Sequence, residues 1–188
     1  MGFMPYYYVL LFGASVLDGG FAAWSALGLA VQTGARPTPL SSDQIPLVQI
    51  DREVIIDIEE LLARLHDPDV VIVDVRSPPE YKGLDVRAAR GGHIPGAVNI
   101  DWEDSLDIER DDRLLPDEVL RSLFWSHGVT PDKEVIVYCQ THHRSSHTYA
   151  VLNHLGYPRV RAYAGSWAQW GNRNDTPIES NVDLVLHK

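Results

Sequence analysis

One short segment of the sequence combines a nucleophile with cationic side chains. Cys139 follows the apolar residues 135–138, is the only cysteine among the 188 residues, and precedes Arg144 by five positions. The loop between them consists of Gln140, Thr141, His142 and His143. A strand that delivers a thiol to a tight loop before a helix brings backbone N–H groups toward the sulfur. The positive end of that helix and Arg144 favour the thiolate, so the segment predicts covalent catalysis by Cys139.

Four motifs, in family order, resemble those of the rhodanese family of thiosulfate and 3-mercaptopyruvate sulfurtransferases. Residues 74–81 read D-V-R-S-P-P-E-Y, residues 92–100 read G-H-I-P-G-A-V-N-I, and residues 139–144 read C-Q-T-H-H-R. The closing residues 165–171, G-S-W-A-Q-W-G, are similar to the end of the second domain in two-domain members. Together the motifs cover about residues 47–179 and are far more specific than any one of them alone.

The resemblance implies a ping-pong transfer of sulfane sulfur through a persulfide on Cys139. The donor would be a small anion such as thiosulfate, with 3-mercaptopyruvate as the second choice, and the acceptor cyanide or a thiol. No metal and no organic cofactor is implied. Related phosphatases and arsenate reductases carry a C-x5-R loop, whereas Cys139 and Arg144 are spaced C-x4-R, which favours transfer of a single sulfur atom.

Other polar residues near the motifs have both structural and functional interpretations. Arg144 closes the loop and is expected to bind the anionic donor, and Arg87 and Arg90 resemble substrate-binding arginines of the family. The adjacent His142 and His143 are interpreted as polar loop residues, because neighbours in a tight loop seldom chelate one ion. Structural roles are expected for a further set: Asp74, Arg76 and Glu80 as an ion network, His93 as a hydrogen-bonding residue, and Trp167 and Trp170 as core.

Composition and net charge indicate which kinds of binding partner and which cellular compartment to expect. The formal net charge of −10 argues against nucleic acid and anionic membranes as partners. One cysteine allows no internal disulfide, so an intracellular, cytoplasmic location is expected. Residues 1–35 are apolar, but no Lys or Arg precedes Arg36 and the run breaks at Asp18. We therefore expect neither a signal peptide nor a membrane span there.

Apolar periodicity predicts an α/β fold with a central parallel sheet flanked by helices. The short apolar β-branched run at residues 70–73 is typical of a buried parallel strand, a second buried strand is expected at 135–138, and a further strand is expected at 160–163. Helices are expected from Ile58, from Pro116, over residues 145–155 and over residues 166–170, with a capping box at Asp57 and Glu60. Strands that alternate with helices favour this architecture.

The N-terminal residues echo the closing motif. Residues 16–24, V-L-D-G-G-F-A-A-W, align with residues 162–170, A-Y-A-G-S-W-A-Q-W, and both are interpreted as a strand end, a turn and a helix. We interpret residues 1–33 as the remnant of a first rhodanese-like domain, 34–46 as a linker and 47–188 as the catalytic domain. The remnant is expected to pack outside the central sheet or to support self-association.

Two alternatives stay open from the sequence. The chain could be a binding or regulatory module that carries sulfur or docks partners without turnover, although the presence of Cys139 argues against this alternative. It could also be a truncated product of low activity. The loop around Cys139 is expected to be accessible, and because most of the first domain is absent, the Cys139 pocket is expected to be more open than in two-domain relatives.

Overall fold

The computed structural model describes residues 16–34 and 53–180. The described residues form two compact units, one of residues 16–34 with 106–115 and one of residues 53–105 with 116–180. Within the described ranges no helix has the length and apolar character needed to cross a bilayer. Residues 35–46 of the predicted linker and the residues before Val16 lie outside the described part.

The larger unit is built on a four-stranded parallel sheet in the order β2-β1-β5-β6. These strands are β1 (Val70–Asp74), β2 (Val98–Asn99), β5 (Glu134–Tyr138) and β6 (Val160–Ala162). The register pairs Asp74 with Tyr138, so β1 and β5 end side by side. The predicted parallel sheet is confirmed, and the chain segments that follow β1 and β5 leave from the same edge.

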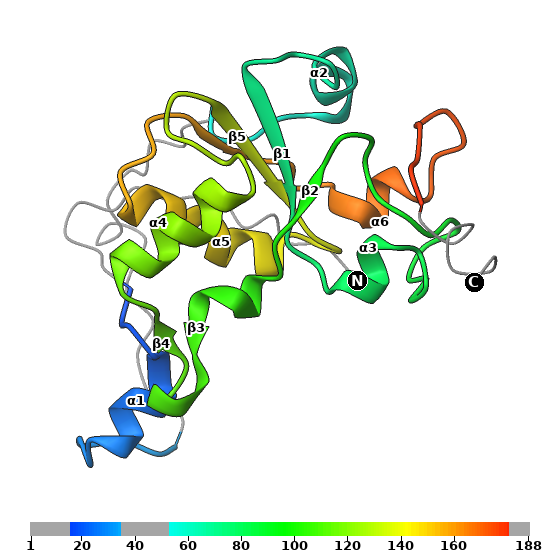
Figure 1. Ribbon diagram of the computed structural model, residues 1–188. Coiled ribbons are helices and arrows are strands. Elements are labelled where there is room, and N and C mark those ends of the chain that lie inside the picture. The colour runs from blue at the N-terminus through cyan, green and yellow to red at the C-terminus, as the bar shows by residue number, and fades with distance from the viewer. Residues whose placement is uncertain (1–15, 35–52, 181–188) are drawn as a thin grey trace, which may run out of the picture. The chain divides into compact units, whose positions relative to one another are not determined.

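Helices cover both faces of this sheet (Figure 1). They are α2 (Ile58–Ala63), α3 (Pro78–Tyr81), α4 (Asp117–Ser126), α5 (His143–His154) and α6 (Ser166–Trp170). α4 and α5 lie on one side, and α2 and α6 on the other (Figure 1). The expected cap is present, because Asp57 Oδ1 accepts from Glu60 N at 2.8 Å. The expected bounds hold for α6, whereas α5 begins two residues earlier than predicted.

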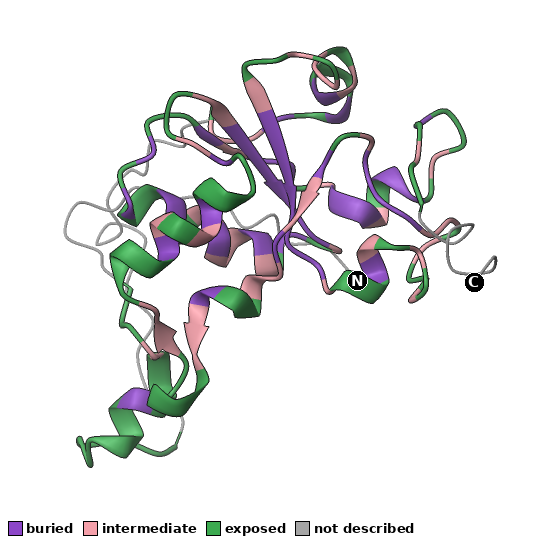
Figure 2. Cartoon of the chain, viewed as in Figure 1, coloured by how far each residue is buried: buried purple, intermediate pink, exposed green. Residues whose placement is uncertain are grey.

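The core follows the alternation of side chains along β1 and β5. Ile72 and Ile136 point to one face, where the buried cluster also holds Ile58 and Leu61 of α2 and Trp167 of α6. The neighbouring valines of both strands are buried on the opposite face, together with apolar residues of α4 and α5. Figure 2 shows β1 and β5 buried along almost their whole length. The edge that carries Tyr138 is therefore rigidly supported from both sides.

The smaller unit contains a helix and a hairpin. α1 (Gly20–Ala26) belongs with β3 (Leu106–Asp107), the 3-10 turn η3 (Ile108–Arg110) and β4 (Arg113–Leu114). Asp18 Oδ1 accepts from Leu114 N at 2.8 Å, and Ala23 is buried. The strand end expected at residues 16–17 is not formed, because both residues lack regular structure. That part of the prediction was wrong, whereas the helix over residues 21–24 is confirmed.

The two copies of the repeat share a local conformation as well as a sequence. Gly20 and the aligned Ser166 begin their helices with φ values of 54° and 51°. Gly20 N donates to Leu17 O at 2.9 Å, and Ser166 N donates to Tyr163 O at 3.2 Å. Positive φ is unusual for a serine, so its match in the aligned copy supports a genuine repeat. The origin of residues 1–33 as a domain remnant stays a prediction.

Candidate active site

Cys139 lies at the carboxyl end of β5, directly before the turn into α5. Its backbone is fixed from α6: Cys139 N donates to Ser166 Oγ at 3.3 Å, and Cys139 O accepts from Trp167 N at 2.9 Å. Its side chain was expected to be accessible, but only 1% of the residue is exposed. This expectation was wrong, because the Cys139 backbone is held against α6 and its sulfur contacts the buried Ser145 of α5.

The loop after Cys139 reverses direction at His142. His142 has a φ of 71°, in the left-handed region, and α5 begins at the next residue. Its Nδ1 lies 2.7 Å from Ser145 Oγ, and that hydroxyl donates to Cys139 Sγ at 3.6 Å. Burial, followed by the neighbouring His143, lowers the pKa of His142 to about 4. The imidazole is therefore neutral at physiological pH.

Arg144 makes a bidentate ion pair with Glu80 of α3. Its Nη1 and Nη2 donate to Glu80 Oε2 and Oε1 at 2.7 and 2.8 Å. Burial by itself would raise the pKa of Glu80, but hydrogen bonds from Arg144 and Ser77 outweigh it and lower the pKa to about 2. The same hydrogen bonds with Glu80 raise the pKa of Arg144. The predicted anion-binding cation is thus already partnered in this structure, and it ties the loop to α3.

Arg87 lies beside the same carboxylate. Its guanidinium pairs with Asp85 at 2.7 Å and stands 3.7 Å from Glu80 Oε1, with 53% of the side chain exposed. The carbonyl of Arg87 accepts from Gln140 Nε2 at 2.9 Å, which joins its segment to the cysteine loop. The structure therefore brings together Arg87, Gln140 and Arg144 around Glu80.

The guanidinium of Arg90 binds backbone carbonyls of residues 170–176. Its guanidinium donates to Thr176 O at 2.9 Å, to Trp170 O at 3.0 Å and to the carbonyl of Arg173. Trp167 Nε1 in turn donates to the carbonyl of Arg90 at 3.1 Å. These contacts give Arg90 a structural role, and its expected role in binding substrate stays a prediction.

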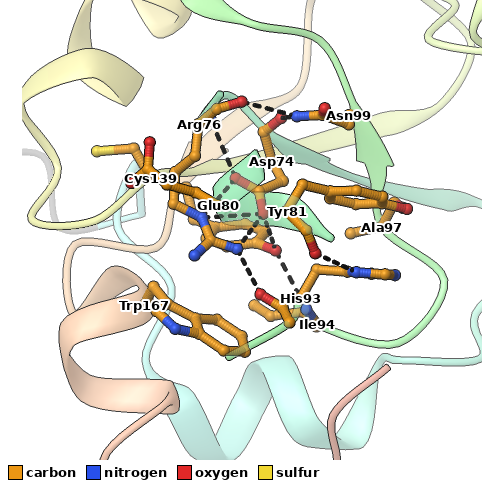
Figure 3. A network of polar contacts seen from close by, with 12 residues as sticks. Asp74, Arg76, Glu80, Tyr81, His93, Ile94, Ala97, Asn99, Cys139 and Trp167 are labelled. Carbon is orange, nitrogen blue, oxygen red and sulfur yellow. Dashed lines mark hydrogen bonds and ion pairs between the residues drawn. The ribbon is translucent and has the colours of Figure 1, made fainter. Parts of the chain in front are cut away.

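Asp74 and Arg76 form a buried ion pair, as predicted. Arg76 Nη2 lies 2.5 Å from Asp74 Oδ2 and also donates to Gly92 O at 2.7 Å (Figure 3). Tyr138 donates to Asp74 at 2.7 Å, and burial raises the pKa of Tyr138, which keeps this donor protonated. The guanidinium also stacks 4.5 Å from the ring of Trp167. In Figure 3 the sulfur of Cys139 points away from this network.

Side chains of the second motif, residues 92–100, form hydrogen bonds with backbone carbonyls of the first motif, residues 74–81. His93 Nδ1 lies 2.8 Å from Tyr81 O, and the two rings stack at 3.7 Å (Figure 3). Asn99 donates to the carbonyls of Asp74 and Arg76 at 2.9 and 2.8 Å. The structural role expected for His93 is confirmed. Hydrogen bonds connect the first two motifs into one network.

Two contributors to the site, Ser145 and Ser166, were not predicted. Both are fully buried and touch Cys139, one through its sulfur and one through its amide. Ser166 has a positive φ, which the sequence does not reveal for a serine. Across residues 16–34 and 53–180, no three His, Cys, Asp or Glu side chains gather where they could hold a metal ion.

Comparison with known proteins identifies close relatives in sequence. The family described as Rhodanese-like domain matches residues 57–173. A thiosulfate sulfurtransferase of Pseudomonas aeruginosa is 47% identical over 165 residues, which cover 87% of this chain and 58% of that protein. The thiosulfate sulfurtransferase of Azotobacter vinelandii is 44% identical, again over 87% and 58% of the two chains. The sulfur carrier protein TtuD of Thermus thermophilus is 36% identical over 87% and 60%.

Solved structures show the same fold. The anaerobic ergothioneine biosynthesis enzyme of Chlorobium limicola, bound to trimethyl histidine, matches with a TM-score of 0.83 and 27% identity. The match covers 92% of this chain and 43% of that enzyme. A variant of EanB that carries a cysteine persulfide with ergothioneine also has a TM-score of 0.83, at 26% identity. The chain spans 58% of the length of the two sulfurtransferases that it matches.

Proposed function

Because the chain belongs to the rhodanese-like domain family, we propose that it transfers sulfane sulfur from thiosulfate through a persulfide on Cys139. The observation that carries the proposal is the position of Cys139 between the end of β5 and the start of α5. The first N–H groups of a helix lack partners within it and can stabilise an anion beside the sulfur. The chain's only thiol therefore stands where negative charge is favoured.

The reaction has two balanced steps. The Cys139 thiolate attacks the outer sulfur of thiosulfate; a new S–S bond forms, the S–S bond of the donor breaks, and sulfite leaves with the electron pair. Cyanide or a thiol then attacks the terminal sulfur of the persulfide and restores the thiolate. Loop N–H groups stabilise the persulfide anion between the steps. Thiosulfate is favoured over 3-mercaptopyruvate because relatives at 47% and 44% identity are thiosulfate sulfurtransferases.

Arg87 is the better remaining candidate for contact with the donor. Its side chain is half exposed, whereas Arg144 is held by both oxygens of Glu80. Arg144 would then act on the donor by fixing the shape of the loop and by its long-range charge. An anionic donor that approached it would compete with Glu80 for the guanidinium.

The test is thiocyanate formation by the purified chain with thiosulfate and with 3-mercaptopyruvate. Turnover with thiosulfate and cyanide-labile sulfur on the protein are expected, and both should be absent from Cys139→Ser. Turnover by Cys139→Ser would overturn the proposal, as would wild-type protein that forms no persulfide.

A second candidate function is sulfur carriage without turnover. It is favoured by the 36% identity with the sulfur carrier protein TtuD and by the burial of Cys139. In that case thiosulfate would load one sulfur per chain, and the sulfur would leave only to a protein acceptor. Stoichiometric loading with negligible thiocyanate turnover would favour this alternative.

A further inference from the structure

We infer that Ser145 and His142 form a relay that holds a hydrogen-bond donor against the Cys139 sulfur and thereby promotes its thiolate and persulfide states. The inference rests on the proposed function, because it takes Cys139 as the sulfur carrier. Ser145 would be the positioning residue that touches the sulfur, and His142 would act through Ser145.

The geometry places three buried side chains in a row. Ser145 Oγ lies 3.6 Å from Cys139 Sγ and 2.7 Å from His142 Nδ1. The exposed fractions of Cys139, Ser145 and His142 are 1%, 0% and 4%. With bulk water so largely excluded, a hydrogen bond to an anionic sulfur is stronger than it would be on the surface.

The direction of these hydrogen bonds follows from the charge on the sulfur. A thiolate or a persulfide anion has no proton to donate, so the single hydroxyl proton of Ser145 must point to Cys139. Ser145 Oγ then accepts from Nδ1–H of His142, which fixes the tautomer of a neutral imidazole. Burial lowers the pKa of His142 to about 4, which agrees with a neutral ring at physiological pH.

The backbone at His142 gives a second, independent reason to assign a role to its side chain. Its φ of 71° is one that glycine adopts freely and asparagine tolerates. A histidine in this conformation is less favourable in conformational energy than a glycine. The cost is offset only if the imidazole contributes something, and among its contacts is the hydroxyl that reaches the sulfur.

Other charged groups surround the relay and are kept constant in its test. Arg144 with Glu80, and Asp74 with Arg76, are ion pairs on the elements that flank the loop. Asp101, which precedes η2 (Trp102–Ser105), and His143 are the further titratable neighbours. A substitution of Ser145 alters none of these residues. A change in the pH dependence of Cys139 reactivity in that variant therefore reports the loss of the Ser145 hydroxyl.

The experiment follows the rate of alkylation of Cys139 by iodoacetamide against pH in the full chain. Because Cys139 is the only cysteine, bulk alkylation reports this one sulfur. For Ser145→Ala the midpoint should move up by about one pH unit, and alkylation at neutral pH should slow about tenfold. The matched control is Ser146→Ala, whose hydroxyl donates to His143 O at 2.7 Å on the same turn; it should behave as wild type.

Two substitutions at His142 separate the relay from a purely structural role. His142→Gly relieves the backbone and removes the imidazole, so it should move the midpoint in the same direction as Ser145→Ala. His142→Asn keeps a side-chain N–H that can reach the hydroxyl and should restore most of the wild-type profile. When combined with Ser145→Ala, His142→Gly should add little, because it acts through that hydroxyl.

The inference is overturned if Ser145→Ala alkylates with the wild-type midpoint, or if His142→Gly and Ser145→Ala shift it additively. ¹⁵N NMR of the imidazole gives an independent readout, in which thiolate protein should show the Nδ1–H tautomer. These results are separate from the proposed function. A wild-type chain that forms no thiocyanate would contradict sulfur transfer, yet the alkylation profiles would still decide the relay.

Discussion

Glu80 and Arg144 lie 64 positions apart in the sequence, yet they meet as a bidentate pair at 2.7 and 2.8 Å. The pairing of Asp74 with Tyr138 explains why, because it ends β1 and β5 side by side. Glu80 follows one strand and Arg144 the other, so both residues reach the same edge of the sheet. The ion pair fastens the cysteine loop to the first motif.

Acid should destabilise the protein through this pair. The pKa of Glu80 is lowered from 4.5 to about 2, so the stabilisation is fully present above pH 4.5 and is lost as the pH falls toward 2. The shift corresponds to about 3 kcal/mol of unfolding free energy. Urea titrations of wild type between pH 6 and pH 2.5 should show this decline, and Glu80→Gln should show a flatter one. Parallel curves for the two proteins would contradict the assignment.

Arg144→Ala should lower kcat/KM for thiosulfate at least about tenfold. Steady-state thiocyanate formation measures the effect. Glu80→Gln distinguishes the cause: if Arg144 acts mainly by holding the loop, breaking its pair from the other side should reduce kcat/KM similarly. An unchanged donor KM in Glu80→Gln, with a raised KM in Arg144→Ala, would instead assign Arg144 to direct contact with the anion.

Arg90 and Arg87 should differ in what their removal changes. Arg90→Ala removes the side-chain donor to Thr176 O and one of the donors to Trp170 O, which also accepts from Thr176 Oγ1, so unfolding should become easier by about 2 kcal/mol. Arg87→Ala removes an exposed pair with Asp85 and should leave the stability of the fold almost unchanged. Its effect should appear as a raised donor KM. Thermal unfolding and donor titrations of both variants check the contrast, which equal losses of stability would contradict.

The sequence predicted those parts of the fold that depend on local pattern. The run at residues 135–138 and the helix of residues 166–170 are found where expected, because apolar periodicity and small-residue turns act over a few positions. α5 begins earlier than predicted because His142 takes up the turn in a left-handed conformation. The hairpin of β3 and β4 was missed because Asp111 and Asp112 have positive φ where Gly or Asn is the usual signal.

The sequence predicted the nucleophile of the site, but not the hydrogen-bond partners of the arginines around it. Cys139 and its loop are visible in the sequence, but the partners of Arg144 and Arg90 depend on which strands and turns become neighbours. A guanidinium that binds a donor and one that binds a carbonyl of its own protein have the same sequence signature. Only the tertiary contacts of Arg90 with Trp170 and Thr176 distinguish them.

Removal of residues 1–39 should leave the larger unit folded. The core of that unit contains Ile72, Ile136 and Trp167, all of which lie outside the deleted segment. Within the smaller unit the deletion removes the contact of Asp18 with Leu114, so any loss of order is expected in the hairpin of residues 106–115. Circular dichroism and thiocyanate formation should therefore stay close to those of the full chain. A chain that no longer folds after the deletion would show that the segment is an integral part of the structure.

The same deletion should reduce self-association. Phe21 and Leu27 of this segment are 69% and 64% exposed, whereas Trp167, which aligns with Phe21 in the closing motif, is 1% exposed. Exposed apolar side chains of this size promote association of a protein with itself. Light scattering over a range of concentrations should give a larger mean mass for the full chain than for the shortened one. Phe21→Ser with Leu27→Ser in the full chain is the matched control, because it keeps the segment and removes two of its apolar contacts. Association that persists in this variant and in the shortened chain would assign self-association to another surface.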